Sequence, residues 1–177
     1  ITNKKSRKKI INNNKSIDKS FMFPYIGFNF KPTDMSAALL NNQISKLNNF
    51  IKIRTKAAKL LITNLIKYNN FFILPSIHKN IKNSWFTFPI VVKKNGKFTK
   101  NQLVDYLNKN NIANRPIIAG NIAEQPFLKK FKFKKTDLSN SKIVMNSGFF
   151  IGLHHKLNKN KVKKIILVFD KFLKSKI

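Results

Sequence analysis

The sequence predicts an α/β fold in which a helix-covered sheet follows one long helix. Short segments rich in β-branched and aromatic residues alternate with helical segments after about residue 67. Strands separated by helices of about ten residues or more are typical of a sheet covered by helices. Before this region, apolar residues recur at helical spacing between residues 35 and 65. With 177 residues, the chain is long enough for one ordinary domain.

The long helix is expected to begin after Pro32, where Thr33 or Asp34 can cap the first free N–H groups. Asn48 and Asn49 mark a position where it can kink or break into two. A continuous helix of about 30 residues would be about 45 Å long, which suits a connector between domains. Its apolar stripe consists of Met35, Ala38, Leu39, Leu47, Phe50, Ile51, Ala57, Ala58, Leu61 and Leu65.

The sheet is expected from four segments, residues 71–74, 85–92, 112–118 and 149–153. Pro116 lacks an N–H group, which should confine its end of the third strand to a sheet edge. Thr99 and Gln102 have the spacing of a capping box and predict the start of a helix with Leu103, Val104 and Leu107 inside. Residues 137–146 predict another helix. Asn158 can cap a last helix, whose inner face carries Val162, Ile165, Ile166, Phe169 and Phe172.

Composition excludes several classes of protein. The chain has no cysteine, so it holds no disulfide, thiolate zinc site or cysteine-ligated iron–sulfur cluster, and this fits a reducing cytoplasm. No apolar run reaches the roughly 18 residues that span a bilayer, and no signal-peptide core follows the basic start, so we expect no membrane partner. The net charge of +30 allows a basic nucleic-acid-binding module as an alternative. The lysines are spread along the chain, however, and abundant Lys, Asn, Ile and Phe are what A/T-rich codons specify, so we favour compositional drift.

Two stretches carry a family resemblance. Residues 27–38 read GFNFKPTDMSAA and resemble the "GYN-x-(R/K)-x-(T/S)-(D/E)-x-x-A-A" segment of the DegT/DnrJ/EryC1/StrS family of sugar aminotransferases and dehydratases. Residues 112–126 read IANRPIIAGNIAEQP; together with NSGFFIG at 146–152 and the following His154 and His155, they are similar to its dehydratase branch. That branch includes GDP-4-keto-6-deoxymannose 3-dehydratase.

The resemblance implies the C-terminal part of a pyridoxal-phosphate-dependent enzyme of fold type I, with a mixed sheet in its small domain. Residues 1–34 would end the large cofactor-binding domain and carry an interface loop, residues 35–66 would form the connecting helix, and residues 67–177 the small C-terminal domain. The family resemblance further implies a homodimer with active sites at the interface. There, Asn29 would bind the phosphate of pyridoxal or pyridoxamine 5'-phosphate in the neighbouring subunit; a simple turn residue is the alternative role.

The implied chemistry depends on a cofactor that acts as an electron sink. The anchor residue, lysine in the aminotransferases and histidine in the dehydratases, would lie upstream of Ile1, so the two reactions stay open and the chain alone should be inactive. We expect a 3-dehydratase of a nucleotide-linked 4-keto-6-deoxyhexose in deoxysugar or lipopolysaccharide biosynthesis, with glutamate as amino donor, and a sugar aminotransferase as the alternative. Residues 1–26, where a related CDP-sugar dehydratase carries most of its iron–sulfur ligands, offer no thiolate.

Arg115 is the leading substrate-binding candidate, because its forked donors suit a diphosphate or sugar hydroxyls. An arginine at a strand edge that pairs with Asp137 or solvent is the alternative. The other substrate-binding candidates are Asn121, Gln125, Lys31, His154 and His155. Adjacent histidines on a strand point to opposite faces, so without a turn the pair cannot hold one ion, and we expect no metal site.

Overall fold

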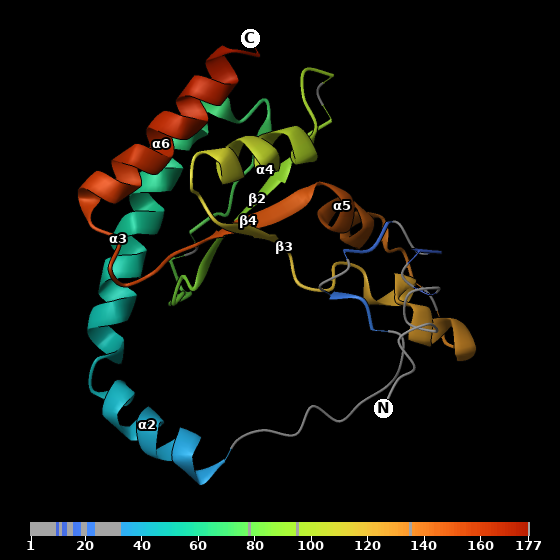
Figure 1. Cartoon of the computed structure of the whole chain (residues 1–177), viewed down its shortest axis with the longest axis horizontal. Helices are drawn as coiled ribbons and strands as arrows, with labels where there is room; N and C mark the ends of the chain where they lie inside the picture. The colour runs from blue at the N-terminus through green and yellow to red at the C-terminus, as the bar shows by residue number, and fades with distance from the viewer. Residues whose placement is uncertain are drawn as a thin grey trace.

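In the part of the chain that the computed structural model describes, the sheet has four strands, and it confirms the predicted fold class of a sheet covered by helices (Figure 1). The structure describes residues 10, 12–13, 16–18, 21–23, 33–77, 79–94, 96–134 and 136–176. The strand order is β1-β2-β4-β3, formed by β1 (Phe72–Ile73), β2 (Thr87–Val92), β4 (Gly148–Gly152) and β3 (Asn114–Pro116). Neighbouring strands within the described residues all pair antiparallel, so the expectation of a mixed sheet is wrong.

Among the described strands, β3 lies at the edge of the sheet and pairs only with β4, with Arg115 opposite Phe150. Pro116 occupies the last position of this strand, as predicted from its missing N–H group. Strand β2 lies in the interior of the sheet, and its burial alternates along the chain, so that Phe88, Ile90 and Val92 point into the core.

Helix α3 (Leu47–Leu65) and helix α6 (Lys159–Lys174) lie side by side along the sheet, and α4 (Lys100–Lys109) packs beside α6 (Figure 1). Asn158 caps α6 as predicted, because its Oδ1 accepts the N–H of Lys161 at 2.9 Å. The predicted capping box of α4 is confirmed as well, with the N–H of Gln102 donating to Thr99 Oγ1 and the N–H of Thr99 donating to Gln102 Oε1. Helix α5 (Ser139–Ser147) leads directly into β4. The core joins these helices to the sheet through residues including Ala58, Leu61, Leu65, Phe72, Phe149 and Phe169.

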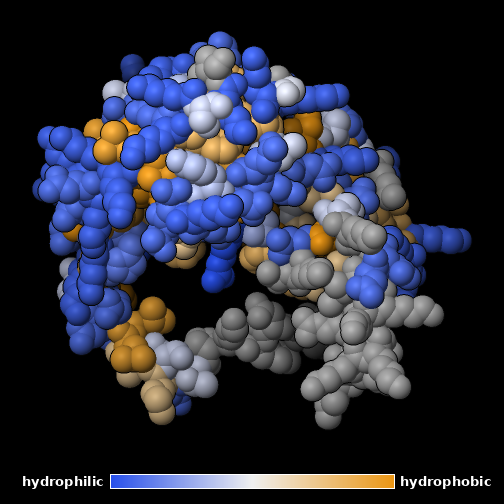
Figure 2. All heavy atoms as spheres, turned by 45° about the horizontal axis from the view of Figure 1, so that its top comes forward, coloured by the Kyte–Doolittle hydropathy of each residue, from blue (hydrophilic) through white to orange (hydrophobic). Residues whose placement is uncertain are grey.

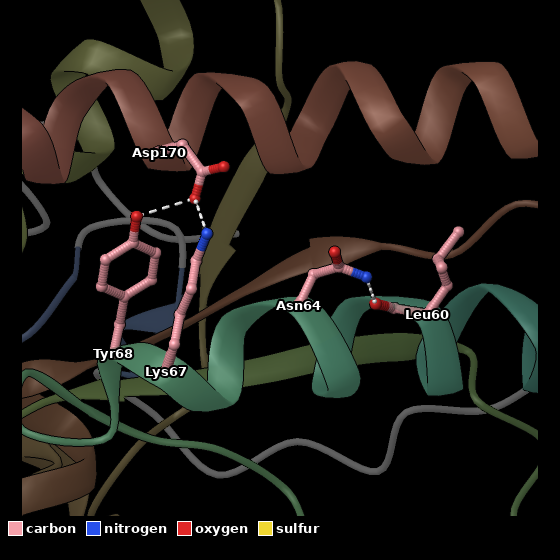
Figure 3. A network of polar contacts seen from close by, with 5 residues as sticks. All are labelled: Leu60, Asn64, Lys67, Tyr68 and Asp170. Atoms are coloured by element: carbon pink, nitrogen blue, oxygen red, sulfur yellow. Dashed lines mark hydrogen bonds and ion pairs between the residues drawn. The ribbon is translucent and has the colours of Figure 1, made fainter.

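A polar contact closes one end of the α3–α6 pair (Figure 3). Helix α3 continues into the short 3₁₀-helix η2 (Ile66–Tyr68). There the Tyr68 hydroxyl and the Lys67 ammonium both reach Oδ1 of Asp170 on α6, at 2.8 and 3.0 Å.

The long helix is broken into α2 (Asp34–Ile44) and α3. Thr33 caps α2, since its Oγ1 accepts the N–H of Ser36. The break falls at Ser45 and Lys46, before the asparagines at which we expected it. Helix α2 buries none of its residues, so the first half of the predicted apolar stripe is exposed, with Met35 at 78% and Leu39 at 67%.

Among the described residues, no helix is long and apolar enough to cross a membrane.

Candidate functional site

A cleft lies where the edge strand β3 meets the first turn of α4. It consists of two neighbouring hollows of about 490 and 280 Å³, which share Asp18, Phe21, Lys100, Asn101 and Pro116. Arg115 lines the larger hollow, and Ala119 and Gly120 line the smaller one. The cleft therefore joins parts of the chain that are far apart in the sequence, from Asp18 to Phe149.

Two cations and one carboxylate define the charge of this cleft. Arg115 is exposed on β3, and Lys100 is the first residue of α4. Burial lowers the pKa of Lys100, an effect that the nearby Asp18 carboxylate opposes. Lysine and arginine beside the start of a helix are the groups that bind phosphate oxygens in proteins. Asp137, the alternative partner for Arg115, instead accepts hydrogen bonds from the backbone N–H and the hydroxyl of Ser139, which lower its pKa.

Gln125 and Asn121, in the chain that follows β3, are buried polar residues. Gln125 is completely buried; its Oε1 accepts the N–H of Phe23 at 2.9 Å, and its Nε2 donates to the carbonyls of Phe21 at 2.9 Å and Ala119 at 3.3 Å. Asn121 is 3% exposed and begins the short 3₁₀-helix η3 (Ile122–Glu124) by accepting the N–H of Ala123. The Gln125 contacts hold residues 21–23 against the loop after β3, which fixes one wall of the cleft.

The two histidines lie at the other end of β4, where the chain turns toward α6. The rule for adjacent histidines on a strand does not apply to them, because they follow β4 at a turn, which brings their ring centroids to 4.0 Å from each other. The ring of His155 stacks on Phe50 of α3, with centroids 4.0 Å apart and planes at 17°. Desolvation lowers the pKa of His155, and electrostatic interactions with His154, Arg54 and Lys156 lower it further. In the part of the chain that the structure describes, no three His, Asp or Glu residues come together to hold a metal ion.

The structure thus separates the substrate-binding candidates into two places. Arg115 pairs with Phe150 in the middle of β4, whereas His154 lies beyond the end of that strand at Gly152. Arg115 lines the cleft, whereas His155 stacks on Phe50 of α3. Asn29 and Lys31 lie outside the described residues.

Sequence reasoning missed Lys100 and Asp18 as residues of the cleft. The capping box at Thr99 was a signal for Lys100, because it places that lysine at the start of a helix, where anions bind. Asp18 lies in polar, basic sequence with no motif, and only the fold brings it to α4.

Comparison with known proteins gives consistent matches. The sequence pattern of the DegT/DnrJ/EryC1/StrS aminotransferase family matches residues 3–169. The chain is 29% identical over 156 residues to the lipopolysaccharide biosynthesis protein RfbH of Salmonella typhimurium, covering 88% of this chain and 36% of that protein. It is 30% identical to the GDP-4-keto-6-deoxy-D-mannose 3-dehydratase of Escherichia coli O55:H7, covering 85% of this chain and 39% of that enzyme.

Solved structures agree with these matches. The E. coli GDP-4-keto-6-deoxy-D-mannose-3-dehydratase with bound hydrated PLP superposes with a TM-score of 0.69 at 29% identity, over 85% of this chain and 39% of that one. The chain therefore spans less than half the length of the relatives that it matches.

Proposed function

Because the chain belongs to the DegT/DnrJ/EryC1/StrS aminotransferase family, we propose that it is the C-terminal part of an enzyme that modifies nucleotide-linked sugars with pyridoxal or pyridoxamine 5'-phosphate. The proposed reaction is 3-dehydration of a nucleotide-linked 4-keto-6-deoxyhexose, with glutamate as amino donor. Similarity to a protein named as a 3-dehydratase, over 85% of this chain, supports this reaction over transamination. Sugar transamination within the same family is the second candidate.

The cleft at β3 is the proposed binding place for the nucleotide diphosphate. The observation that carries this role is the placement of Arg115 and Lys100 in one hollow of about 490 Å³. Arg115 offers forked donors to two phosphate oxygens, and Lys100 adds a point charge. Because Lys100 is half-buried and its pKa is lowered by burial, an anionic ligand would stabilise its charged form.

Asn29 is the residue of this chain that would hold the cofactor, through an amide N–H on its phosphate. This role stays a prediction from the sequence motif, because Asn29 lies outside the described residues. When bound, the cofactor would supply an electron sink at the sugar carbon.

Helix α2 supports the proposed homodimer, whereas the division into residues 1–34, 35–66 and 67–177 stays a prediction from the family resemblance. Its apolar side chains form a surface that includes Met35, Leu39, Leu40 and Ile44, each at least 56% exposed. Figure 2 shows this surface as an orange patch at the end of the molecule, in contrast to the mostly blue surface elsewhere. A patch of this kind marks an interface, here with the large domain or a second subunit.

The deciding experiment is to read the gene upstream of Ile1 and to assay the encoded full-length protein on a 4-keto-6-deoxy sugar nucleotide with glutamate. A histidine at the anchor position and loss of the C3 hydroxyl would support dehydration. A lysine there and a stable amino sugar would shift the assignment to transamination. A full-length protein that neither binds the cofactor nor converts such a sugar would overturn both.

The diphosphate role of the cleft is tested on the chain itself by titration with GDP and with guanosine. GDP should bind more tightly than guanosine, and Arg115→Gln should weaken GDP binding about tenfold, because a hydrogen bond to a charged group is worth about 1.5 kcal/mol or more. Lys163→Gln is the matched control, since it removes one charge from the exposed face of α6, outside the cleft. Equal weakening by both variants would reduce the effect to general electrostatics.

A further inference from the structure

Arg54, in the middle of α3, has a buried donor for which the described residues offer no acceptor. Its Nε is shut off from solvent, and nothing within the described residues accepts a hydrogen bond from it. A buried donor left unsatisfied costs about 1–3 kcal/mol, so the folded protein gains from any acceptor that reaches it. Arg54 is also half-buried and makes none of the ion pairs found in the described part of the chain.

Phe86 lies near the guanidinium of Arg54. The Arg54 Cζ lies 5.9 Å from the ring centroid of Phe86, which is 71% exposed. A cation over an aromatic ring uses the ring face, and the N–H groups in the guanidinium plane stay available for an oxyanion. Phe50 lies one turn earlier on the same face of α3, and His155 stacks on it, so the histidine pair lies beside Arg54.

His154 adds a donor of fixed direction to this place. Its Nδ1 accepts the backbone N–H of Lys156 at 3.1 Å, so in the neutral ring the proton is on Nε2. The contact orients the ring and leaves Nε2–H as a donor next to His155, whose ring centroid is 4.0 Å away. Two histidines and one arginine are thus brought together by one turn of α3 and the turn after β4.

The local charge favours an anion. The groups that depress the pKa of His155 by their charge are His154, Arg54 and Lys156, all of them cationic or potentially cationic. Next to them lies a hollow of about 570 Å³, in which His155 and Lys156 meet the apolar side chains of Ile53, Ala57 and Val162. Such a hollow suits the apolar part of a small organic anion.

We propose that Arg54, His154 and His155 form a second binding site, for the carboxylate or phosphate group of a small organic anion. Arg54 supplies the forked donors, His154 a single N–H, and the hollow between α3 and the start of α6 takes the rest of the ligand. The site lies beyond the proposed diphosphate cleft, at the opposite end of β4. A free ligand is favoured over a carboxylate of a second copy, because the chain has only 6 acidic residues against 36 Lys and Arg.

The test is an NMR titration of the 177-residue chain with inorganic phosphate and with phenyl phosphate, followed at the Arg54 Nε–H and histidine ring signals. These signals should shift and saturate, and the pKa of His155 should rise in the complex, because an anion favours the imidazolium form. Phenyl phosphate should bind more tightly than inorganic phosphate if the apolar hollow takes part.

Arg54→Gln should weaken phosphate binding at these signals about tenfold or more, and Arg54→Lys by less, because it keeps the charge but loses the fork. Lys163→Gln, an exposed lysine elsewhere on α6, should leave binding unchanged. If circular dichroism shows that Arg54→Gln does not fold, Arg54→Lys becomes the test variant. Phosphate binding by Arg54→Lys with wild-type affinity would overturn the site. Equal weakening of phosphate binding by Lys163→Gln would also overturn the site. So would self-association of the chain that phosphate reverses in sedimentation experiments, because Arg54 would then bind a second copy of the chain.

Discussion

Tyr68 donates its hydroxyl to the carboxylate of Asp170 at 2.8 Å, across 102 positions in the sequence. This contact joins the end of α3 to α6, and Lys67 reaches the same oxygen at 3.0 Å (Figure 3). Tyr68 is 8% exposed, whereas the side chain of Lys67 is 54% exposed. The tyrosine therefore contributes more stability than the ion pair, because solvent screens an exposed pair.

Tyr68→Phe should lower the free energy of unfolding by about 1–2 kcal/mol, because it removes a hydrogen bond to a charged group and leaves the ring packing intact. Urea unfolding followed by circular dichroism measures it. Tyr106→Phe is the matched control, since that ring packs on Phe172 and its hydroxyl makes no hydrogen bond in the described residues. Equal losses of unfolding free energy in the two variants would mean that the hydrogen bond between Tyr68 and Asp170 does not stabilise the fold.

The same contact predicts a loss of stability at high pH. Burial raises the pKa of Tyr68, and its hydrogen bond to Asp170 raises it further. The folded state therefore binds this proton more tightly than the unfolded state, so the contribution is complete below about pH 10 and is lost as pH rises through the raised pKa. The Lys67 pKa, raised mainly by its hydrogen bond to Asp170, acts with the same sign in the same range.

Unfolding of the wild type and of Tyr68→Phe should be compared between about pH 8 and pH 11. Both proteins lose the same lysine charges as pH rises, so the difference between their free energies of unfolding reports the contribution of the Tyr68 hydroxyl. This difference should shrink as pH rises above about 10, and a difference independent of pH would contradict the assigned pKa direction.

The sequence predicted the features that depend on residues close together in the chain, such as helix caps. The capping box at Thr99 and the cap at Asn158 each satisfy N–H groups within three residues, so no distant contact is needed to define them. The edge position of Pro116 follows from its own missing donor. The family motifs indicated the fold that the solved relatives share.

Features that depend on distant contacts or on turns were not predictable in this way. The strand expected from Trp85 begins only at Thr87, because the backbone of Trp85 is left-handed with φ 50° and its N–H donates to Asn83. The burial of Gln125 depends on residues 21–23, about 100 positions away in the sequence. From the sequence alone, the Gln125 amide suits a ligand site as well as a structural role. Only the fold shows that its amide hydrogen-bonds to the described backbone.

Gly120 and Gly96 allow a steric test of the loop that lines the cleft. Both have positive φ, 63° and 69°, so alanine should cost about 1 kcal/mol at each from backbone strain alone. A Cβ at Gly120 would lie 2.5 Å from Cγ of Met145, whereas a Cβ at Gly96 meets nothing within 4 Å. Gly120→Ala should therefore lose about 1–3 kcal/mol more than Gly96→Ala in urea unfolding, and equal losses would mean that Met145 moves away freely.

Gln125→Glu should destabilise the fold strongly while keeping the shape of the side chain. One carboxylate oxygen can still accept the N–H of Phe23, but the other would replace the Nε2 donor and face the carbonyls of Phe21 and Ala119. The site is completely buried, so the charge would be repelled without solvent to screen it, at a cost of about 3 kcal/mol. Urea unfolding at neutral pH measures this loss, which should diminish in acid as the introduced carboxyl binds a proton.

Gln102→Glu is the matched control for this prediction, because it makes the same chemical change at an exposed position. Glutamate serves as well as glutamine in a capping box, and a negative charge in the first turn of α4 suits the helix dipole, so its stability should stay within about 0.5 kcal/mol of the wild type. Hydrogen exchange then locates the effect, since Gln125→Glu should speed exchange of the Phe23 N–H, which Gln125 holds at 2.9 Å. Unchanged protection of that N–H would show that the segment before the Asn29 motif is held by other contacts, and that Gln125 does not fix this wall of the cleft.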